Sequence, residues 1–490
     1  MKKKALLIAF LIAIMAGGSV SIITVHFGRA QTGTNVNGII YSNATWTQAG
    51  SPYTFTGPVA VNVGVTLTIE AGTIVNFDNN YLQVNGTLVA IGTSRNYIQF
   101  NGPSAFSGVD FTALSNGWNE HTDSGSIIQY ANVSSISISL ESPAKIDHNI
   151  LTGNIVMDSV VEASCGIISN NIVTASYGDG IECSGNASVM DNTVVGAVWG
   201  GIDAFSGSPT IQGNLVIGNM GWNGAMPQGG IVVRNGYNSN APINPLIQDN
   251  TITNNNAGIT VANTVSTQNV VPIISNNNIY GNQKYNFYLN PLSYDLSATN
   301  NWWGTIDTQA INQTVYDFKD NFNYGNVTFV PFLTVPNPNA PTYINATAIT
   351  GGSIAPSGII SLSYDGSQSF TITPSSGYYI TGVLVNGTSV GAVGSYTLQN
   401  ISGATTISAT FALTPTATPS PSPTPTPSST PATSSSPSPT ASPTASLTAS
   451  PSSTPTIPEF PTIIVILPLL LSVFFVAVIF RHRKTANLGK

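Results

Sequence analysis

The central part of the chain repeats one short pattern of polarity: an apolar residue, two polar residues, Asn, any residue, and an apolar residue. Regular copies follow one another at about 22 residues, a period typical of solenoid proteins. The copies contain Asn149, Asn171, Asn192, Asn214, Asn250, Asn277 and, in a degraded form, Asn301. Because a solenoid repeat buries its core only against its neighbours, the pattern predicts a stack of coils.

Apolar positions elsewhere in each repeat alternate with a period of two. Two residues after each Asn stand Leu151, Val173, Val194, Val216, Ile252, Ile279 and Trp303. A small residue followed by an apolar one recurs at Gly180-Ile181, Gly201-Ile202, Gly230-Ile231, Gly258-Ile259 and, more loosely, Asn286-Phe287. This alternation indicates strands. We expect at least two short strands in each repeat, and Asn side chains that hydrogen-bond along the stack as a ladder.

The amino-acid sequence of the repeats resembles that of one family of known proteins. The phrases IISNNIV, IQGNLVIGN, LIQDNTITNNNAGI, IISNNNIYGN and NNWWGT are similar to coils of the pectin-lyase-like superfamily. Residues 65–92 resemble the first coils of that group. The resemblance covers roughly residues 35–336 and implies an all-β, right-handed parallel β-helix of about ten coils. The superfamily contains lyases, hydrolases, adhesins and inert scaffolds, so the resemblance does not specify an activity.

The two tryptophans of NNWWGT and the segment that follows them mark the end of the solenoid. We expect Trp302 and Trp303 to be core and end-capping residues. An open last coil would expose unpaired strand edges, so a cap is required. Residues 315–335 are predicted to supply it.

Composition divides the chain into five segments. Residues 1–30 read as a signal peptide or N-terminal anchor, with lysines before an apolar run. Residues 31–340 form the β-helix. Residues 341–412 are a small β-rich module that resembles divergent internalin-type repeats, which act as spacers or contact modules. Residues 413–457 are a Ser/Thr/Pro-rich stalk that cannot bury a core and is expected to stay disordered. Residues 458–490 form the C-terminal anchor.

The C-terminal segment combines three signals. Residues 463–480 are an apolar run long enough to cross a bilayer as a helix. The basic tail that follows places this end in the cytoplasm and the β-helix outside the cell. Pro458, Glu459 and Phe460 resemble the archaeal sorting signal that contains these three residues. That resemblance implies processing by an archaeosortase-type enzyme and a lipid anchor; the alternative is an ordinary single-pass anchor.

Several Asn-x-Ser/Thr sequons fit an extracellular glycoprotein. They contain Asn43, Asn85, Asn132, Asn186, Asn312, Asn326, Asn345, Asn386 and Asn400.

Charge and cysteine usage exclude several classes of protein. Charged residues make up 7% of the chain, the net charge is −7, and the 13 Lys and Arg residues cluster at the two ends. The absence of a basic stripe argues against a nucleic-acid partner. The 2 cysteines, Cys165 and Cys183, fall at different positions of the coil, so we expect buried, unbridged thiols.

Acidic residues provide the one chemical lead. Glu182 and Asp203 each follow an inward Ile in successive coils, so both carboxylates are expected to point outward, about one strand spacing of 4.8 Å apart. Arg234, on the next coil, is placed to reach them diagonally, and Asp179 lies in the bend before Glu182. Glu182, Asp203 and Arg234 are our catalytic candidates. Calcium is a candidate cofactor at Asp179, Glu182 and Asp203, because a cation relieves repulsion between close carboxylates.

The regular period is interrupted beside these residues. The long step from Asn214 to Asn250 contains two insertions that carry Trp222 and Tyr237, and Trp199 lies one coil earlier. Loops that break a solenoid commonly carry function. Carboxylates, an arginine and aromatic rings on one outer face suit sugar binding.

We therefore expect a non-enzymatic, membrane-anchored cell-surface protein for attachment or recognition in the cell envelope or extracellular matrix. Its expected partners are the membrane and polysaccharide or other envelope components. The first alternative is a surface carbohydrate-active enzyme, either a polysaccharide lyase or a glycoside hydrolase. The second alternative is a purely structural envelope component.

Overall fold

The structure is a computed structural model that describes residues 33–103, 107–153, 161–174, 178–221, 229–235, 243–263 and 270–415. The predicted signal segment, the stalk beyond residue 415 and the C-terminal anchor, with Pro458, Glu459 and Phe460, lie outside the described residues. Within the described ranges, no helix combines the length and the apolar character that a membrane crossing requires.

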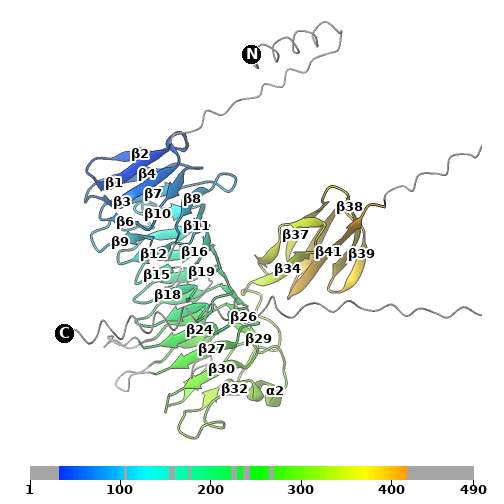
Figure 1. The fold of residues 1–490 in the computed structure, drawn as a ribbon. Helices are drawn as coiled ribbons and strands as arrows, with labels where there is room; N and C mark the ends of the chain where they lie inside the picture. The colour runs from blue at the N-terminus through cyan, green and yellow to red at the C-terminus, as the bar shows by residue number, and fades with distance from the viewer. Residues whose placement is uncertain are drawn as a thin grey trace, which may run out of the picture. The chain divides into compact units, whose positions relative to one another are not determined.

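Each regular coil of the stack carries three short strands, one more than the minimum that the sequence predicts. In one coil these are β16 (Ile167–Ser169), β17 (Ile172–Thr174) and β18 (Ile181–Cys183). Each strand pairs in parallel with its equivalent in the next coil. The chain therefore folds as a parallel β-helix with three faces, and Figure 1 shows its strands stacked from β1 to β32.

Face 1 is the ten-stranded sheet. Besides β16, it contains β2 (Ala44–Trp46), β4 (Thr66–Ile69), β7 (Thr87–Ile91), β10 (Ile127–Gln129), β13 (Lys145–Asp147), β19 (Ser188–Met190), β22 (Thr210–Gln212), β25 (Leu246–Gln248) and β28 (Ile273–Ser275). Faces 2 and 3 together form the 21-stranded sheet and are joined through β3.

Face 2 follows the Asn-containing turns. Besides β17, it contains β1 (Thr34–Ile40), β3 (Tyr53–Val61), β5 (Ile74–Asn76), β8 (Ile98–Asn101), β11 (Ala131–Ser134), β14 (Ile150–Thr152), β20 (Thr193–Val195), β23 (Leu215–Ile217), β26 (Thr251–Thr253) and β29 (Asn278–Tyr280). Besides β18, face 3 contains β6 (Tyr81–Val84), β9 (Gly108–Phe111), β12 (Ser137–Leu140), β15 (Val161–Ala163), β21 (Ile202–Ala204), β24 (Gly229–Arg234), β27 (Ala257–Ala262), β30 (Tyr285–Asn290) and β32 (Val315–Tyr316).

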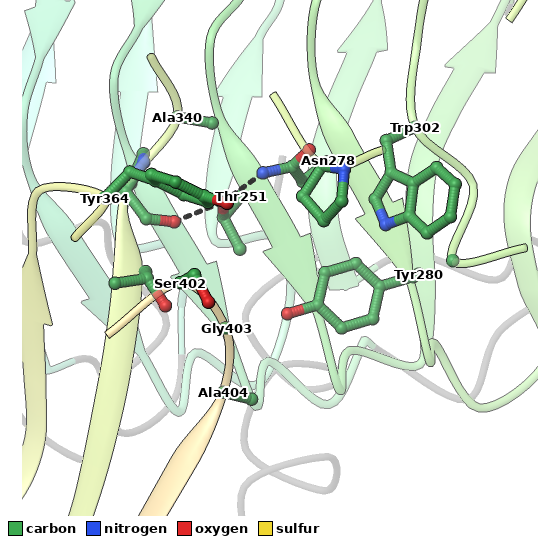
Figure 2. A pocket seen from close by; sticks show the side chains of 13 residues that line it. Thr251, Asn278, Tyr280, Trp302, Ala340, Tyr364, Ser402, Gly403 and Ala404 are labelled. Atoms are coloured by element: carbon green, nitrogen blue, oxygen red, sulfur yellow. Dashed lines mark hydrogen bonds between the residues drawn. The ribbon is translucent and has the colours of Figure 1, made fainter. Parts of the chain in front are cut away.

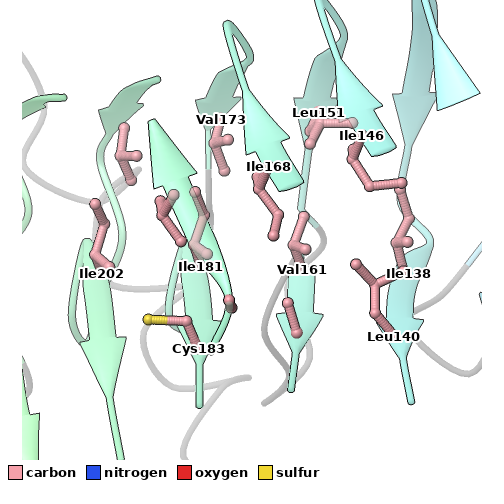
Figure 3. Close-up of a cluster of buried hydrophobic side chains, with 14 of the residues drawn as sticks. Ile138, Leu140, Ile146, Leu151, Val161, Ile168, Val173, Ile181, Cys183 and Ile202 are labelled. Atoms are coloured by element: carbon pink, nitrogen blue, oxygen red, sulfur yellow. The ribbon is translucent and has the colours of Figure 1, made fainter. Parts of the chain in front are cut away.

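The apolar stripe that the sequence predicts is the core of the β-helix. Val173 pairs in register with Leu151 on one side and Val194 on the other, and Val194 pairs in turn with Val216. All four side chains are fully buried. Figure 3 shows Leu151 and Val173 in one interior with Val161 and Ile181 of face 3. Each such side chain contributes roughly 1.5–3 kcal/mol when it leaves water.

The predicted asparagine ladder is also present. The Nδ2 atom of each Asn donates to the Oδ1 atom of the Asn one coil further on, at 2.9–3.0 Å, from Asn149 through to Asn301. The residue before each ladder Asn has a left-handed backbone, as at Asn170 (φ 55) and Asp191 (φ 56). Asn, Asp and Gly adopt this conformation with the least strain, which explains their recurrence at the turn.

A second, shorter ladder stands five residues after the first one and was not predicted. Asn219 donates to Asn255 at 2.9 Å, Asn255 to Asn282 at 3.1 Å, and Asn282 to Asn286 at 3.0 Å. This ladder holds the bend between faces 2 and 3 in the later coils.

The predicted capping segment contributes to the C-terminal end of the core. It follows the helix α2 (Thr308–Gln313) and includes β32 and β33 (Val327–Thr328), the latter paired with β31 (Leu296–Ser297). Val315 and Val327 are buried in the same core as Trp303. Trp303 is therefore a core residue as predicted, whereas Trp302 is only half-buried. At the other end, the 3-10 turn η1 (Gln48–Gly50) follows β2.

The small module is a separate two-sheet unit with its own core. A five-stranded sheet has the order β36-β34-β41-β38-β39 and a three-stranded sheet the order β35-β37-β40. The strands are β34 (Thr342–Ala348), β35 (Gly352–Ala355), β36 (Gly358–Leu362), β37 (Gly366–Pro374), β38 (Tyr378–Val385), β39 (Thr388–Gly391), β40 (Ser395–Ile401) and β41 (Thr405–Leu413). Tyr343 packs on Leu215 and Ile217 of face 2, and its hydroxyl accepts from Asn254 at 3.0 Å.

Both cysteines are free, as predicted. Cys183 is buried in register with Ala163 and Ala204. Cys165 is only half-buried, so the expectation of two buried thiols is correct for Cys183 alone.

Candidate functional site

Three carboxylates occupy one outward-facing column of face 3. Glu162, Glu182 and Asp203 are paired in register on successive coils, and Val232 takes the next position. The predicted neighbours Glu182 and Asp203 are thus adjacent. Glu162 extends the column by one coil and was not identified from the sequence, because its strand lacks the preceding Gly that marks the later copies.

Arg234 closes over the end of this column. Its Nε and Nη2 atoms lie 2.6 and 2.5 Å from the Oδ2 atom of Asp203. This is the diagonal contact that the spacing predicts. The side chain of Asp203 is only 2% exposed and that of Arg234 26%. Asp203 points away from the core, as its place in the strand predicts, but its side chain is buried rather than open to solvent. Glu182 is half-buried.

Asp179 joins the cluster from the bend before β18. Its Oδ1 atom accepts a hydrogen bond from the backbone N of Gly200 at 2.5 Å, and the residue is 3% exposed. A Cβ atom on Gly200 would lie 2.7 Å from the same oxygen, so the bend needs glycine there. We call Asp179, Glu182, Asp203 and Arg234 the carboxylate cluster.

Burial and mutual repulsion dominate the electrostatics of the carboxylate cluster. Burial, reinforced by the negative charge of Asp203, raises the pKa of Asp179 well above its usual value. Burial also raises the pKa of Asp203, but the Arg234 guanidinium opposes that shift. The pKa of Arg234 is raised chiefly by Asp203, so the arginine stays charged. When a single proton is present in the cluster, Asp179 is therefore its preferred position.

One oxygen of the cluster is left for another donor. The Oδ1 atom of Asp203 is buried and makes no hydrogen bond with the described residues. A buried carboxylate oxygen without a donor is costly, so such an atom marks a position where a further hydrogen-bond donor is favourable.

The predicted calcium set does not form a coordination group. In the part of the chain that the structure describes, no three His, Cys, Asp or Glu side chains are arranged to hold a metal ion. Here the guanidinium of Arg234 already supplies a positive charge to Asp203.

The three aromatic candidates differ in what the structure describes. Trp199 is half-buried, and its backbone N donates to the carbonyl oxygen of Gly178 at 3.4 Å, which places it at the bend that holds Asp179. Trp222 and Tyr237 lie outside the described residues. The structure therefore brings Glu182, Asp203, Arg234, Asp179 and the backbone of Trp199 into one region.

The predicted glycosylation sites differ in exposure. Those with exposed side chains are Asn43, Asn186, Asn326, Asn386 and Asn400. Those with half-buried side chains are Asn85, Asn132, Asn312 and Asn345.

The fold defines the protein as a parallel β-helix with an appended β module. Comparisons with protein-family models, curated proteins and solved structures find no match to this chain.

Proposed function

We propose that this protein is a cell-surface β-helix that recognises a glycan of the cell envelope or extracellular matrix, without catalysis. The observation that carries the proposal is the carboxylate cluster on face 3. The chain has only 7% charged residues, yet four ionisable side chains meet at one place on the outer wall of the β-helix. Two of them are almost fully buried, which costs free energy that a purely structural wall does not require.

The charge of the column indicates which glycans fit. Asp179, Glu182 and Asp203 act on one base among the described residues, Arg234, so the site is acidic even with one carboxyl protonated. Glu162 adds a further carboxylate one coil from Glu182. Uronic acids and sulfated sugars would meet like charge, which is unfavourable at short range. Hydroxyl groups and ammonium groups would instead donate to carboxylate oxygens. The preferred ligands are therefore neutral or amino-bearing polysaccharides.

A glycan array probed with the detergent-solubilised full chain tests this function. We expect binding to neutral or amino-sugar polysaccharides that falls at least tenfold in Glu182→Gln. Glu70→Gln, which removes an exposed carboxylate elsewhere, serves as the matched control and should bind normally. Binding restricted to uronate-rich or sulfated glycans, or binding that Glu182→Gln leaves unchanged, would contradict the proposal.

Glycoside hydrolysis is the second candidate, and one observation favours it. A hydrolase needs one protonated and one ionised carboxyl group close together. The raised pKa of Asp179 supplies a candidate acid beside Glu182. Release of reducing sugar ends that disappears in Asp179→Asn would establish this activity, and release of unsaturated ends would indicate a lyase. The purely structural alternative predicts neither binding nor release.

The placement of the protein rests on its terminal segments. We propose an exported, membrane-anchored chain whose residues 458–490 are a single-pass anchor or a substrate of an archaeosortase-type enzyme. We also propose that the β-helix is right-handed, as nearly all parallel crossover connections are, and that it is of the pectin-lyase-like type. Intact-mass analysis of the native protein would show whether the C-terminal segment is removed, and mass spectrometry of its peptides would show which sequons carry sugars.

We propose no resident calcium. Because Arg234 neutralises Asp203, glycan binding should be the same after treatment with EDTA. A loss of binding that added Ca²⁺ restores would overturn this point.

A further inference from the structure

A small aromatic pocket lies on face 2, where the last coils meet the first strand of the small module (Figure 2). Its volume is about 230 Å³. The side chains that determine its chemistry are Tyr280, Trp302, Tyr364, Thr342 and Ser402. It is separate from the carboxylate cluster, which lies on face 3.

Hydrogen bonds fix the wall behind the pocket. The Oγ1 atom of Thr251 donates to the carbonyl oxygen of Pro341 at 2.5 Å. The Oδ1 atom of Asn278 accepts from the backbone N of Asn337 at 2.7 Å, and its Nδ2 atom contacts Thr251 at 3.4 Å. Residues 337–341 are thus tied to the β-helix, so the pocket is held open by contacts formed before any ligand arrives.

Two aromatic rings from neighbouring coils form one side of the pocket. Tyr280 ends β29, and Trp302 belongs to the next coil, which is bridged to Asn278. Figure 2 shows the Tyr280 and Trp302 rings next to each other, with Tyr364 of the module on the other side of Asn278 and Thr251. Burial raises the pKa of Tyr280 to about 12, so its phenol stays neutral and able to donate.

The polar groups of the pocket favour a ligand that carries hydroxyls. Thr342 lines the pocket with a hydroxyl whose Oγ1 atom is buried from solvent. Ser402 provides a second hydroxyl, on the exposed side. No described residue that lines the pocket is charged. The pocket therefore offers apolar ring faces and hydroxyl partners but no partner for an ionic group.

We propose that this pocket binds one neutral pyranose ring of a glycan, stacked against Tyr280 and Trp302 and hydrogen-bonded to Ser402. Its volume is below the roughly 300–1,000 Å³ of sites for drug-sized ligands, which limits it to a single ring. The proposal shares its ligand class with the proposed function, but it concerns a different face of the β-helix. Either site can therefore fail without the other.

The test uses the full chain in detergent and four probes: glucose, galactose, mannose and N-acetylglucosamine. Saturation-transfer NMR and titration calorimetry should detect at least one of them. Replacing one ring should weaken binding roughly tenfold, because an aromatic contact contributes on the order of 1 kcal/mol. Tyr280→Ala and Trp302→Ala should both show this loss, whereas Trp302→Phe should retain binding.

Two controls separate the pocket from a general effect on the fold. Tyr97→Ala removes a half-buried tyrosine far from the pocket and should bind normally. Ala404→Leu fills the exposed side of the pocket while leaving its rings in place, and should abolish binding. The pocket variants are also measured in the Glu182→Gln background, in which the carboxylate cluster is disabled, so that the remaining sugar binding is that of this pocket. Binding of none of the four sugars, or preferential binding of a proline-rich peptide with the sequence of the stalk, would overturn the proposal.

Discussion

The asparagine ladder predicts a large and local loss of stability when one member is removed. Asn192 lies in the middle of the ladder and is 1% exposed. Its Oδ1 atom accepts from the backbone N and the Nδ2 of Asn171, both at 3.0 Å. Its Nδ2 atom donates to the carbonyl oxygen of Ile168 at 2.8 Å and to Asn214 at 3.0 Å. Asn192→Ala removes all four hydrogen bonds at once.

The size of the stability loss depends on which hydrogen bonds each partner of Asn192 keeps. The Nδ2 of Asn171 keeps the carbonyl oxygen of Ile146, and Asn214 keeps the backbone N of residue 192, so each of these losses costs about 1 kcal/mol. The backbone N of Asn171 has no other acceptor shown and stays buried, which costs a further ~1–3 kcal/mol. The expected total is about 3–5 kcal/mol, which corresponds to roughly a hundredfold to several thousandfold in a local opening equilibrium.

Native-state hydrogen exchange is the appropriate assay, because solenoids can open coil by coil. Amides of β17 and β20 should lose most of their protection in Asn192→Ala, while those of β4 and β7 should keep theirs. Asn116→Ala is the matched control, since this exposed side chain makes a single hydrogen bond, to Thr87. If protection in β17 and β20 falls no further in Asn192→Ala than in Asn116→Ala, the ladder does not stabilise the coils as argued.

Two more predictions concern the core and the carboxylate cluster. Leu151→Ala should destabilise the protein by about 2–5 kcal/mol, because it leaves a cavity among fully buried neighbours. Thr152→Ala, on the outer side of the same strand, should cost well under 1 kcal/mol. Thermal unfolding of the two variants measures both losses. Because the pKa of Asp179 is raised in the folded state, the folded protein binds its proton more tightly, and the stability linked to this group is present at low pH and declines as pH rises through the folded pKa. Asp179→Asn should flatten that decline, and urea-unfolding midpoints measured across the acidic to neutral range test this. A wild-type midpoint that rises as Asp179 ionises would contradict the assignment.

The sequence predicts the stacking of this protein well because neighbours in a solenoid are related by one period. Val173, Val194 and Val216 occupy the same position of the sequence repeat, and the structure places them in register. The same logic placed Glu182 beside Asp203. What the period cannot show is how a long side chain bends. Arg234 covers Asp203, so a carboxylate that points outward, as predicted, is nevertheless buried.

Residues outside the repeated sequence motif are harder to predict. Glu162 belongs to the same column as Glu182, but its coil lacks the small residue that marks the later copies. The aromatic pocket joins Tyr280 and Trp302 to Tyr364 of another module, and no period in the sequence relates them. Contacts between modules depend on how the connecting residues 336–341 run, which is a tertiary property.

The neighbouring coils show that the fold itself does not need the charges of the carboxylate cluster. Along face 3, Val232 takes the place of Asp203 one coil later, and Ala262 takes the place of Arg234. Arg234→Ala alone should cost about 3–5 kcal/mol, because it leaves the Asp203 carboxylate buried without its partner. The double change Asp203→Val with Arg234→Ala gives each position the residue found one coil later. It should restore the stability to within about 1 kcal/mol of the wild type, since apolar replacements of buried ion pairs are often neutral. Urea unfolding of the wild-type chain and the two variants measures this directly. A double variant as unstable as the single one would show that the ion pair serves the fold, whereas recovered stability with lost glycan binding would show that it serves recognition.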